Sequence, residues 1–380
     1  MSQLKTNAIR HISATSDAIT LASDGGLTDI SGGQLGNRNK VYNGAMQIAQ
    51  RSTSAITISD GSNEGYQTVD RWDHLFAGGM GGSITSQQVT DAPEGFRNSL
   101  KLTCASTGTT LDSTQHLQIR QKLEGQDIVD FAYGDSSAKK TTISWYMKAV
   151  NPKIMCANVM TTLSSGRYWT KKFTPTTSWA RYSMVVDGDT SNATDETSSH
   201  GYSVQFSLAI GSGKRQASDS TSWTSTANLG VDGMENFLDS TSNELYITGV
   251  QVEVGNLTPY EHRSYRDELL RCARYYQQIG GHSQFPGRGA GNTEMTFTVP
   301  LIVPLRASPT VSKTNSYYRG YDPSNAGNST NTPTVMTWNA YHNYLSLLLT
   351  GFTSSTGVED DKCATLQQWN DGVTKLDAEL

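Results

Sequence analysis

The sequence predicts a mainly β protein, with an antiparallel, jelly-roll-like β-sandwich, a connector α-helix and a second, smaller β-domain. Several strand-length segments alternate apolar and polar residues, as antiparallel strands do when one face is buried and the other is solvated. Serine, threonine, glycine and asparagine are abundant, whereas charged residues make up only 17% of the chain. This composition suits short strands joined by turns. A chain of 380 residues is long enough for two or three domains.

Residues 1–36 are predicted to form an N-terminal leader. The segment has little apolar content and ends in the glycine-rich stretch from Gly32 to Gly36. A leader of this kind cannot bury a core alone, so we expect it to stay disordered or to become ordered on a partner.

Residues 37–263 are predicted to form the sandwich. Five segments within it carry alternating apolar residues: Leu100, Leu102 and Cys104; Leu117 and Ile119; Ile143, Trp145 and Met147; Tyr182, Met184 and Val186; and Tyr202, Val204, Phe206, Leu208 and Ile210. A sixth segment, residues 245–254, reverses its phase at Gly249, which predicts a β-bulge there. Several such strands separated by turn-rich gaps favour a β-sandwich, and jelly-roll topology fits best.

Residues 264–291 are predicted to be a connector helix followed by a linker. Ser264 and Asp267 have the spacing of a capping box, Gly280 ends the helix, and the glycine-rich linker runs to Gly291. The apolar face of this helix is predicted to lie either at an oligomer interface or at a domain interface. The spacing of the residues does not distinguish these two alternatives. The residues of this face are Leu269, Cys272, Ala273, Tyr276 and Ile279.

Residues 292–380 are predicted to form the second β-domain. Met295, Phe297, Val299 and Leu301 alternate with polar residues, and later strands are expected at residues 334–338 and 344–349. The segment from 320 to 333 has the composition of a long exposed loop.

Charge and hydropathy limit the classes of partner. The formal net charge is -5 and long lysine or arginine runs are missing, so we expect no nucleic-acid binding. No stretch approaches the roughly 18 apolar residues of a membrane span, and the N-terminus lacks the apolar core of a secretory signal. The four cysteines lack metal-binding spacing and are expected to be buried free thiols in a protein assembled in a reducing cytoplasm.

The sequence carries no clear catalytic pattern. Glycoside hydrolysis requires two carboxyl groups about 5–5.5 Å or 6.5–9.5 Å apart. The candidates are Glu64, Asp70 and Asp73, or the acidic residues within 187–196. Asp70 beside Arg71 favours a structural ion pair or a turn, and the 187–196 segment has turn composition. We therefore expect no enzymatic activity, no cofactor and no metal.

An aromatic cluster in the second β-domain is the best binding candidate. Aromatic rings next to amide, hydroxyl and imidazole groups suit sugars, whose C–H faces stack on rings while their hydroxyl groups form hydrogen bonds. The alternative is that these side chains belong to a core or are buried between subunits. The predicted glycan-binding residues are Tyr317, Tyr318, Tyr321, Trp338, Tyr341, His342 and Tyr344.

Seven segments serve as landmarks that together span roughly residues 4 to 310, and they are residues 4–21, 37–51, 69–72, 143–147, 246–255, 259–265 and 268–276. Together these segments resemble tail-fibre-like virion structural proteins of tailed bacteriophages. The leader resembles that of fibre-like proteins of marine and cyanobacterial phages.

The resemblance implies a carbohydrate-binding-module-like fold for the sandwich, a homotrimer, and a leader that contacts other virion proteins. It implies a location in the virion and a function as an adhesin that binds a host cell-surface glycan. An alternative of another class is a head fibre or capsid decoration protein with a purely structural role. A glycan depolymerase is less favoured, because the carboxylate pattern is missing.

Overall fold

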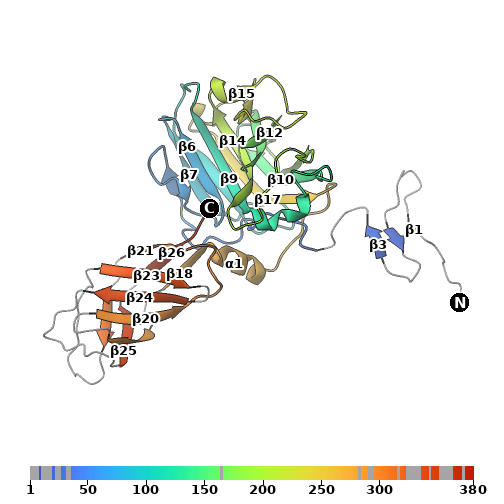
Figure 1. Cartoon of the computed structure of the whole chain (residues 1–380). Helices are drawn as coiled ribbons and strands as arrows, with labels where there is room; N and C mark the ends of the chain where they lie inside the picture. Colours follow the sequence, from blue (N-terminus) through green and yellow to red (C-terminus); the bar gives the residue numbers. More distant parts are fainter. Residues whose placement is uncertain are drawn as a thin grey trace. The chain divides into compact units, whose positions relative to one another are not determined.

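The computed structural model describes residues 8–9, 19–21, 27–30, 36–162, 166–280, 284–289, 294–314, 317–321, 335–341, 344–350, 363–369 and 373–380. The chain divides into two compact units, residues 1–265 and residues 266–380 (Figure 1). Both units are built mainly from antiparallel sheets, and α1 (Tyr265–Ala273) is the α-helix of the described residues. The predicted fold class is therefore confirmed. Within the described ranges, no helix has the length and hydropathy that a membrane crossing requires.

The leader contains three short strands, β1 (Ala8–Ile9), β2 (Ile19–Leu21) and β3 (Leu27–Ile30). They form an antiparallel sheet in the order β1-β2-β3. The sequence predicts a leader without structure of its own. In the structure, these three segments instead satisfy backbone hydrogen bonds by pairing with one another.

The sandwich consists of two antiparallel sheets, each with six strands among the described residues. The first sheet has the order β13 (Ala180–Val186), β10 (Thr141–Ala149), β17 (Glu244–Val254), β8 (Ser99–Ser106), β7 (Ser83–Val89) and β4 (Ile56–Ile58). The second sheet has the order β12 (Arg167–Phe173), β11 (Met155–Thr161), β14 (His200–Ile210), β9 (His116–Glu124), β6 (Asp73–Ala77) and β5 (Gly65–Tyr66). Figure 1 shows β14 and β9 alongside β10 and β17 in the body of the sandwich.

The predicted alternation places the apolar residues in the core between the two sheets. Trp72, Trp145 and Phe206 are fully buried there, and the ring centroids of Trp145 and Phe206 are 5.2 Å apart. Ile210 is an exception, because the register of β14 shifts between Ser207 and Ala209. That shift places Ala209 in the main core and Ile210 in a second cluster with Leu229, Val231, Met234 and Cys156.

The predicted bulge at Gly249 is confirmed. The register with β10 runs from Ser144 opposite Gln251 to Tyr146 opposite Thr248, so β17 carries one extra residue. Gly249 has a φ of +61°, and a Cβ atom there would lie 2.7 Å from both Phe96 Cζ and Tyr146 Cδ2. Only glycine combines this backbone conformation with this close approach. The bulge lets Leu245, Ile247, Val250 and Val252 all reach the core.

The connector helix is shorter than predicted. After α1 ends at Ala273, the chain turns, and Tyr276 and Ile279 lie in strand β18 (Tyr276–Ile279). This strand pairs with β26 (Val373–Asp377), a strand about a hundred residues further along the chain that local spacing cannot reveal. The predicted interface residues therefore do not share one helix face. Cys272, Ala273 and Tyr276 are buried, whereas Leu269 and Ile279 are half-buried.

The predicted linker is also a strand. β19 (Gln284–Gly289) pairs with β20 (Glu294–Pro300) on one side and β25 (Cys363–Trp369) on the other. A Cβ atom on Gly287 would overlap Phe297 and the Thr296 carbonyl oxygen, so this glycine allows close strand packing rather than flexibility. The second unit accordingly begins at Arg266 and not at residue 292.

The second unit contains two sheets within its described residues. The smaller has the order β18-β26-β21, in which β21 is Thr310–Thr314. The larger has the order β22 (Tyr317–Tyr321), β25, β19, β20, β24 (Tyr344–Thr350) and β23 (Val335–Tyr341).

Candidate functional site

The strand order divides the predicted aromatic cluster. Tyr317, Tyr318 and Tyr321 lie on β22, at one edge of the larger sheet. Trp338 and Tyr341 lie on β23 at the other edge, and four strands separate the two in the described part of this sheet. Tyr341 and Tyr344 are Cα partners at the end of the β23–β24 hairpin. His342 and the side chains of the other six residues lie outside the described residues, so their role in binding stays a prediction.

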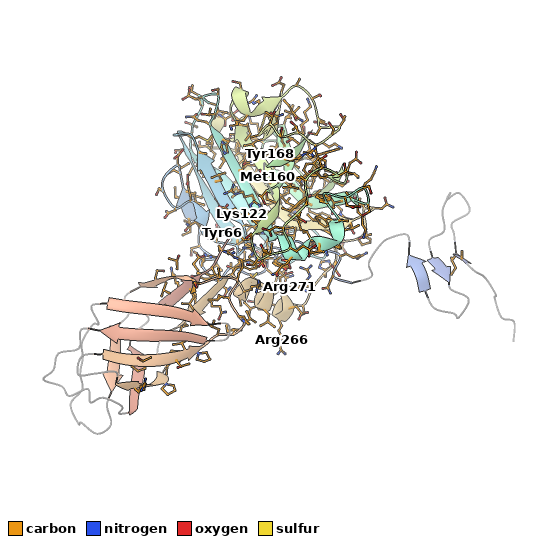
Figure 2. All side chains as sticks on the ribbon, in the orientation of Figure 1. Tyr66, Lys122, Met160, Tyr168, Arg266 and Arg271 are labelled. Atoms are coloured by element: carbon orange, nitrogen blue, oxygen red, sulfur yellow. The ribbon has the colours of Figure 1, made fainter. Side chains whose placement is uncertain are left out.

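A different surface emerges on the sandwich, on the outward side of the second sheet, which we call the polar face. It consists of the side chains that alternate with the core residues on β5, β6, β9, β14, β11 and β12. Figure 2 shows four of them, Tyr66, Lys122, Met160 and Tyr168, on the body of the sandwich. Residues that are Cα partners across antiparallel strands point to the same face, so the register defines rows of neighbouring side chains.

Two rows cross this face. The first runs across all six described strands and consists of Tyr66, Asp73, Arg120, Gln205, Asn158 and Thr170. The second row is adjacent and consists of Lys122, Ser203, Met160 and Tyr168. The first row begins at Tyr66 on the edge strand β5, and the second row ends at Tyr168 on the opposite edge strand β12. Polar side chains occupy most of the other positions in the two rows.

Hydrogen bonds fix the middle of the polar face. Gln118 Nε2 donates to Gln205 Oε1 at 3.0 Å and to Ser207 Oγ at 2.9 Å. Gln205 Nε2 in turn donates to Ser203 Oγ at 2.8 Å. Asn158 Nδ2 donates to Ser207 Oγ at 2.6 Å, while Asn158 Oδ1 is buried and accepts no hydrogen bond from the described residues. A linked amide and hydroxyl network of this kind holds its members in one orientation.

The segment from Asn228 to Val231 covers one side of the polar face. Ser207 Oγ and Asn158 Nδ2 both donate to Leu229 O, and Thr170 Oγ1 donates to Asn228 O at 2.6 Å. Leu229 packs in the second apolar cluster described above, which Tyr168 also contacts. Next to this segment, the small residue Ser203 of β14 is fully buried, whereas Lys122, Met160 and Tyr168 on the neighbouring strands are half-buried.

Two arginines lie beside the ring of Tyr66 at one end of the face. The guanidinium carbons of Arg51 and Arg71 lie 5.5 Å and 5.9 Å from the Tyr66 ring centroid. Arg71 is fully buried with a φ of +72°, which is uncommon for a residue with a side chain, and its Nη2 donates to Lys122 O at 2.6 Å. Arg120 Nε donates to Asp73 Oδ2 at 2.6 Å, and Lys122 Nζ lies 3.9 Å from the same oxygen.

Two histidines near this end are held neutral. Burial, with further contributions from Lys122, Arg120 and Arg71, lowers the pKa of His200 to about 4. Burial likewise lowers the pKa of His74, whose Nδ1 donates to Gly65 O at 3.1 Å. Both effects disfavour the imidazolium form.

The candidate catalytic carboxylates are engaged in structural contacts. Asp70 accepts hydrogen bonds from Gln50 N and Gln50 Nε2, and burial raises its pKa. Its Oδ1 lies 3.8 Å from Arg51 Nη1, which forms an ion pair with it. The sequence suggests the adjacent Arg71 as the partner instead. In the 187–196 segment, Asp189 pairs with Arg167 at 2.8 Å, and Asp195 accepts from Thr197 N, as turn chemistry predicts.

The outward side of the first sheet offers a contrast. Lys148 Nζ lies 4.7 Å from the Tyr246 ring centroid, and Lys101 Nζ lies 5.4 Å from it. Asp91 pairs with Lys148 at 2.6 Å, and Glu244 pairs with Lys101 at 2.8 Å. Each of these two lysines thus pairs with a carboxylate on its own face of the sandwich.

Reasoning from the sequence missed the polar face. The alternation that identified the core implies an outward set on each strand, and Gln118, Arg120 and Lys122 between the apolar residues of β9 are such a set. Composition does not distinguish them from ordinary solvated positions. Only the strand order brings them beside Gln205, Asn158 and Asp73.

No protein-family model matches the sequence, and no curated protein matches it. Among solved structures, the chain is similar to the enzymatically active domain of bacteriophage CBA120 tailspike protein 4, with 11% identity and a TM-score of 0.31, over 57% of this chain and 21% of that chain. It is also similar to a CBM4 structure (18% identity, TM-score 0.29, 56% of this chain and 97% of that chain). A third similar structure is a family 11 carbohydrate-binding module from Clostridium thermocellum (13% identity, TM-score 0.29, 56% of this chain and 99% of that chain). Similarities of this size carry no information about function.

Proposed function

We propose that this chain binds glycans through the polar face of the sandwich, as a tail-fibre-like adhesin of a bacteriophage virion. The observation that carries the proposal is the pair of adjacent rows in which half-buried side chains lie over a buried layer of amide and hydroxyl groups. The half-buried residues are Tyr66, Arg120, Lys122, Met160 and Tyr168. Sugars are recognised by this combination, since ring faces pack on aromatic side chains while hydroxyl groups bond to fixed polar groups.

The network in the middle of the face supports binding at low entropic cost. Gln118, Gln205 and Ser203 are buried and held by one another, so they form a fixed layer beside the half-buried side chains that a ligand can reach. Tyr168 and Met160 are half-buried, which leaves apolar surface for a sugar ring.

The virion role rests on the sequence resemblance. The proposed virion role includes a homotrimer, a leader that contacts other virion proteins, and assembly in the host cytoplasm. Three equal sites on one particle component would raise the avidity for a repetitive host surface without new contacts. The role also includes binding without catalysis, because the candidate carboxylates Asp70, Asp189 and Asp195 are held in structural contacts.

A glycan panel tests the binding proposal. The full chain should bind at least one surface polysaccharide, and Tyr168→Ala should weaken that binding about tenfold, which corresponds to the roughly 1.4 kcal/mol expected of a lost ring contact. Tyr246→Ala is the matched control, because Tyr246 is a half-buried tyrosine on the outward side of the other sheet. Thermal unfolding verifies that both variants remain folded.

The outcomes separate the alternatives. Loss of binding in Tyr246→Ala, with none in Tyr168→Ala, would move the site to the first sheet. A panel without any bound glycan would overturn glycan binding. Release of reducing sugar from a bound polysaccharide would overturn the non-catalytic role, and cryo-electron microscopy that locates the chain on the capsid instead of the tail would overturn the tail-fibre role.

A further inference from the structure

The chain enters and leaves the sandwich at the same place. Asn39, which follows the leader, is buried, and its backbone N donates to Glu261 Oε2 at 2.7 Å. Arg263 Nη2 donates to the carbonyl oxygen of Asn39, and Arg263 Nη1 donates to Val41 O at 2.9 Å. We call these four residues the entry–exit clamp. The second unit begins directly after it in the sequence, at Arg266.

The entry side of the clamp is built into the first sheet. β8 pairs with the first part of β17, residues 244–247. Beyond the bulge, residues 39–44 lie beside β17, and Val250 N donates to Gly44 O at 3.0 Å. The side chain of Asn39 extends this pairing, because its Oδ1 accepts from Val252 N and its Nδ2 donates to Val250 O. Asn39 is therefore fixed to the last strand of the sandwich.

The exit side of the clamp is held by alternate residues. Tyr260 and His262 pack against the ring of Phe96, with ring centroids 4.9 Å and 5.0 Å apart. Glu261 and Arg263, which alternate with them, make the contacts with Asn39 described above. Glu261 N also donates to the side chain of Gln251 at 2.8 Å. The last residues of the first unit are thus bonded directly to its first buried residue after the leader.

We propose that the entry–exit clamp carries mechanical tension between the leader and the second unit, so that the sandwich stays folded while the chain is pulled. A pull from the leader reaches Asn39, a pull from the second unit reaches Arg263, and these two residues are hydrogen-bonded to each other. The strands between them, residues 56–254, form a closed loop behind this contact and bear no load until it opens. The inference goes beyond glycan binding and does not depend on it.

The chemistry of the clamp suits this role. The guanidinium group of Arg263 is half-buried and donates to two backbone carbonyl groups at once. Hydrogen bonds from a charged donor are stronger than those between neutral groups, and the planar guanidinium group holds both in a fixed geometry. Backbone acceptors are also displaced less readily than flexible side chains, because the backbone of Asn39 is itself paired with β17.

Optical tweezers test the proposal on the full-length protein, with handles at the two termini and a constant force. Unfolding of the sandwich is recognised by the release of roughly 750–800 Å of chain, as expected for residues 39–263. Arg263→Ala should shorten the lifetime of the folded sandwich under force by about tenfold or more, since forced unfolding follows the unfolding rate and charged hydrogen bonds contribute that much.

Arg215→Ala is the matched control variant. Arg215 is also a half-buried arginine that donates to two backbone carbonyl groups, those of Ile210 at 2.7 Å and Met234 at 3.3 Å. Both of its acceptors lie within the closed loop. With handles at the termini, this variant should therefore have the lifetime of the wild-type protein.

A second attachment of the handles separates mechanical protection from general stability. Handles at Ser136 and Ser218, two exposed positions within the closed loop, apply the load behind the clamp. Arg215→Ala should then shorten the lifetime, because Arg215 lies close to one handle along the chain. Arg263→Ala should leave the lifetime unchanged in this attachment.

The possible results are distinct. An equally shortened lifetime of Arg263→Ala in both attachments would show an ordinary stabilising contact and would overturn the proposal. A wild-type lifetime of this variant between the termini would overturn it too. Arg263→Lys keeps the charge but loses the two parallel donors, so it should have an intermediate lifetime between the termini. This variant takes the place of Arg263→Ala if urea unfolding shows that the alanine variant does not fold.

Discussion

Arg120 on β9 and Asp73 on β6 are Cα partners, and their side chains form an ion pair on the polar face with Nε 2.6 Å from Oδ2. The Asp73 side chain is only 6% exposed, so its carboxylate has lost most of its hydration. A charge in that environment depends on its partner, unlike a charge at the surface.

Replacement of this carboxylate should therefore be costly. We expect Asp73→Asn to lower the free energy of unfolding by about 1–3 kcal/mol, because Arg120 would keep a partly buried charge without its counter-ion. The control is Asp91→Asn, which breaks a pair of the same 2.6 Å length whose Asp91 side chain is 47% exposed. That change should cost about 1 kcal/mol or less. Urea unfolding measures both, and equal losses would contradict the argument from burial.

The bulge at Gly249 should tolerate no side chain. Gly249→Ala combines a left-handed backbone conformation with contacts at 2.7 Å to Phe96 and Tyr146, so we expect a loss of about 2–4 kcal/mol. Gly255→Ala isolates the backbone contribution, because Gly255 has a φ of +86° and open space around its Cβ position. We expect about 1 kcal/mol there. Similar costs at both sites, measured by denaturant unfolding, would show that Phe96 and Tyr146 move aside readily.

Acid should destabilise the protein before its carboxylates titrate. The pKa of His200 is lowered to about 4 in the folded state, so between pH 6.5 and pH 4 the unfolded chain binds a proton that the folded chain does not. Stability then falls as the pH falls, by roughly 2 kcal/mol between pH 6.5 and pH 5 for a shift of this size. His74, whose pKa is also lowered, acts in the same direction.

His200→Gln should flatten this dependence, because glutamine does not titrate. Urea unfolding at pH 7.5, 6.5 and 5.0 compares the variant with the wild-type protein. The same loss of stability in both would mean that His200 does not hold a depressed pKa.

The homotrimer implied by the resemblance has a direct test. Light scattering of the full-length protein should report three times the 41.3 kDa chain mass at micromolar concentration. Tyr276→Asp places a charge at a position that is 2% exposed in β18, so we expect it to unfold the second unit. Leu269→Asp, at a half-buried position on α1, should reduce trimer formation with less effect on folding. A stable wild-type monomer would refute the trimer.

Local pattern alone determined much of the sandwich. A period of two is a property of each strand by itself, so Leu100, Leu102, Ile143, Trp145 and Val204 could be assigned to a core without knowledge of their partners. The bulge at Gly249 was visible for the same reason, since the phase reversal lies within eleven consecutive residues of β17. The start of α1 near Ser264 followed from its capping residues.

The tertiary structure decided which strands are neighbours, and with them the sites. Tyr276 and Ile279 suit a helix by spacing, yet hydrogen bonds to β26 place them in a strand. Gly287 suits a linker by composition, yet its close packing against Phe297 makes it part of a sheet. The polar face exists only because β5, β6, β9, β14, β11 and β12 pair in that order, and the same kind of pairing puts β22 and β23 at opposite edges. Periodicity is set by the chain's own geometry, whereas pairing is a choice among distant segments that depends on the free energy of the whole fold.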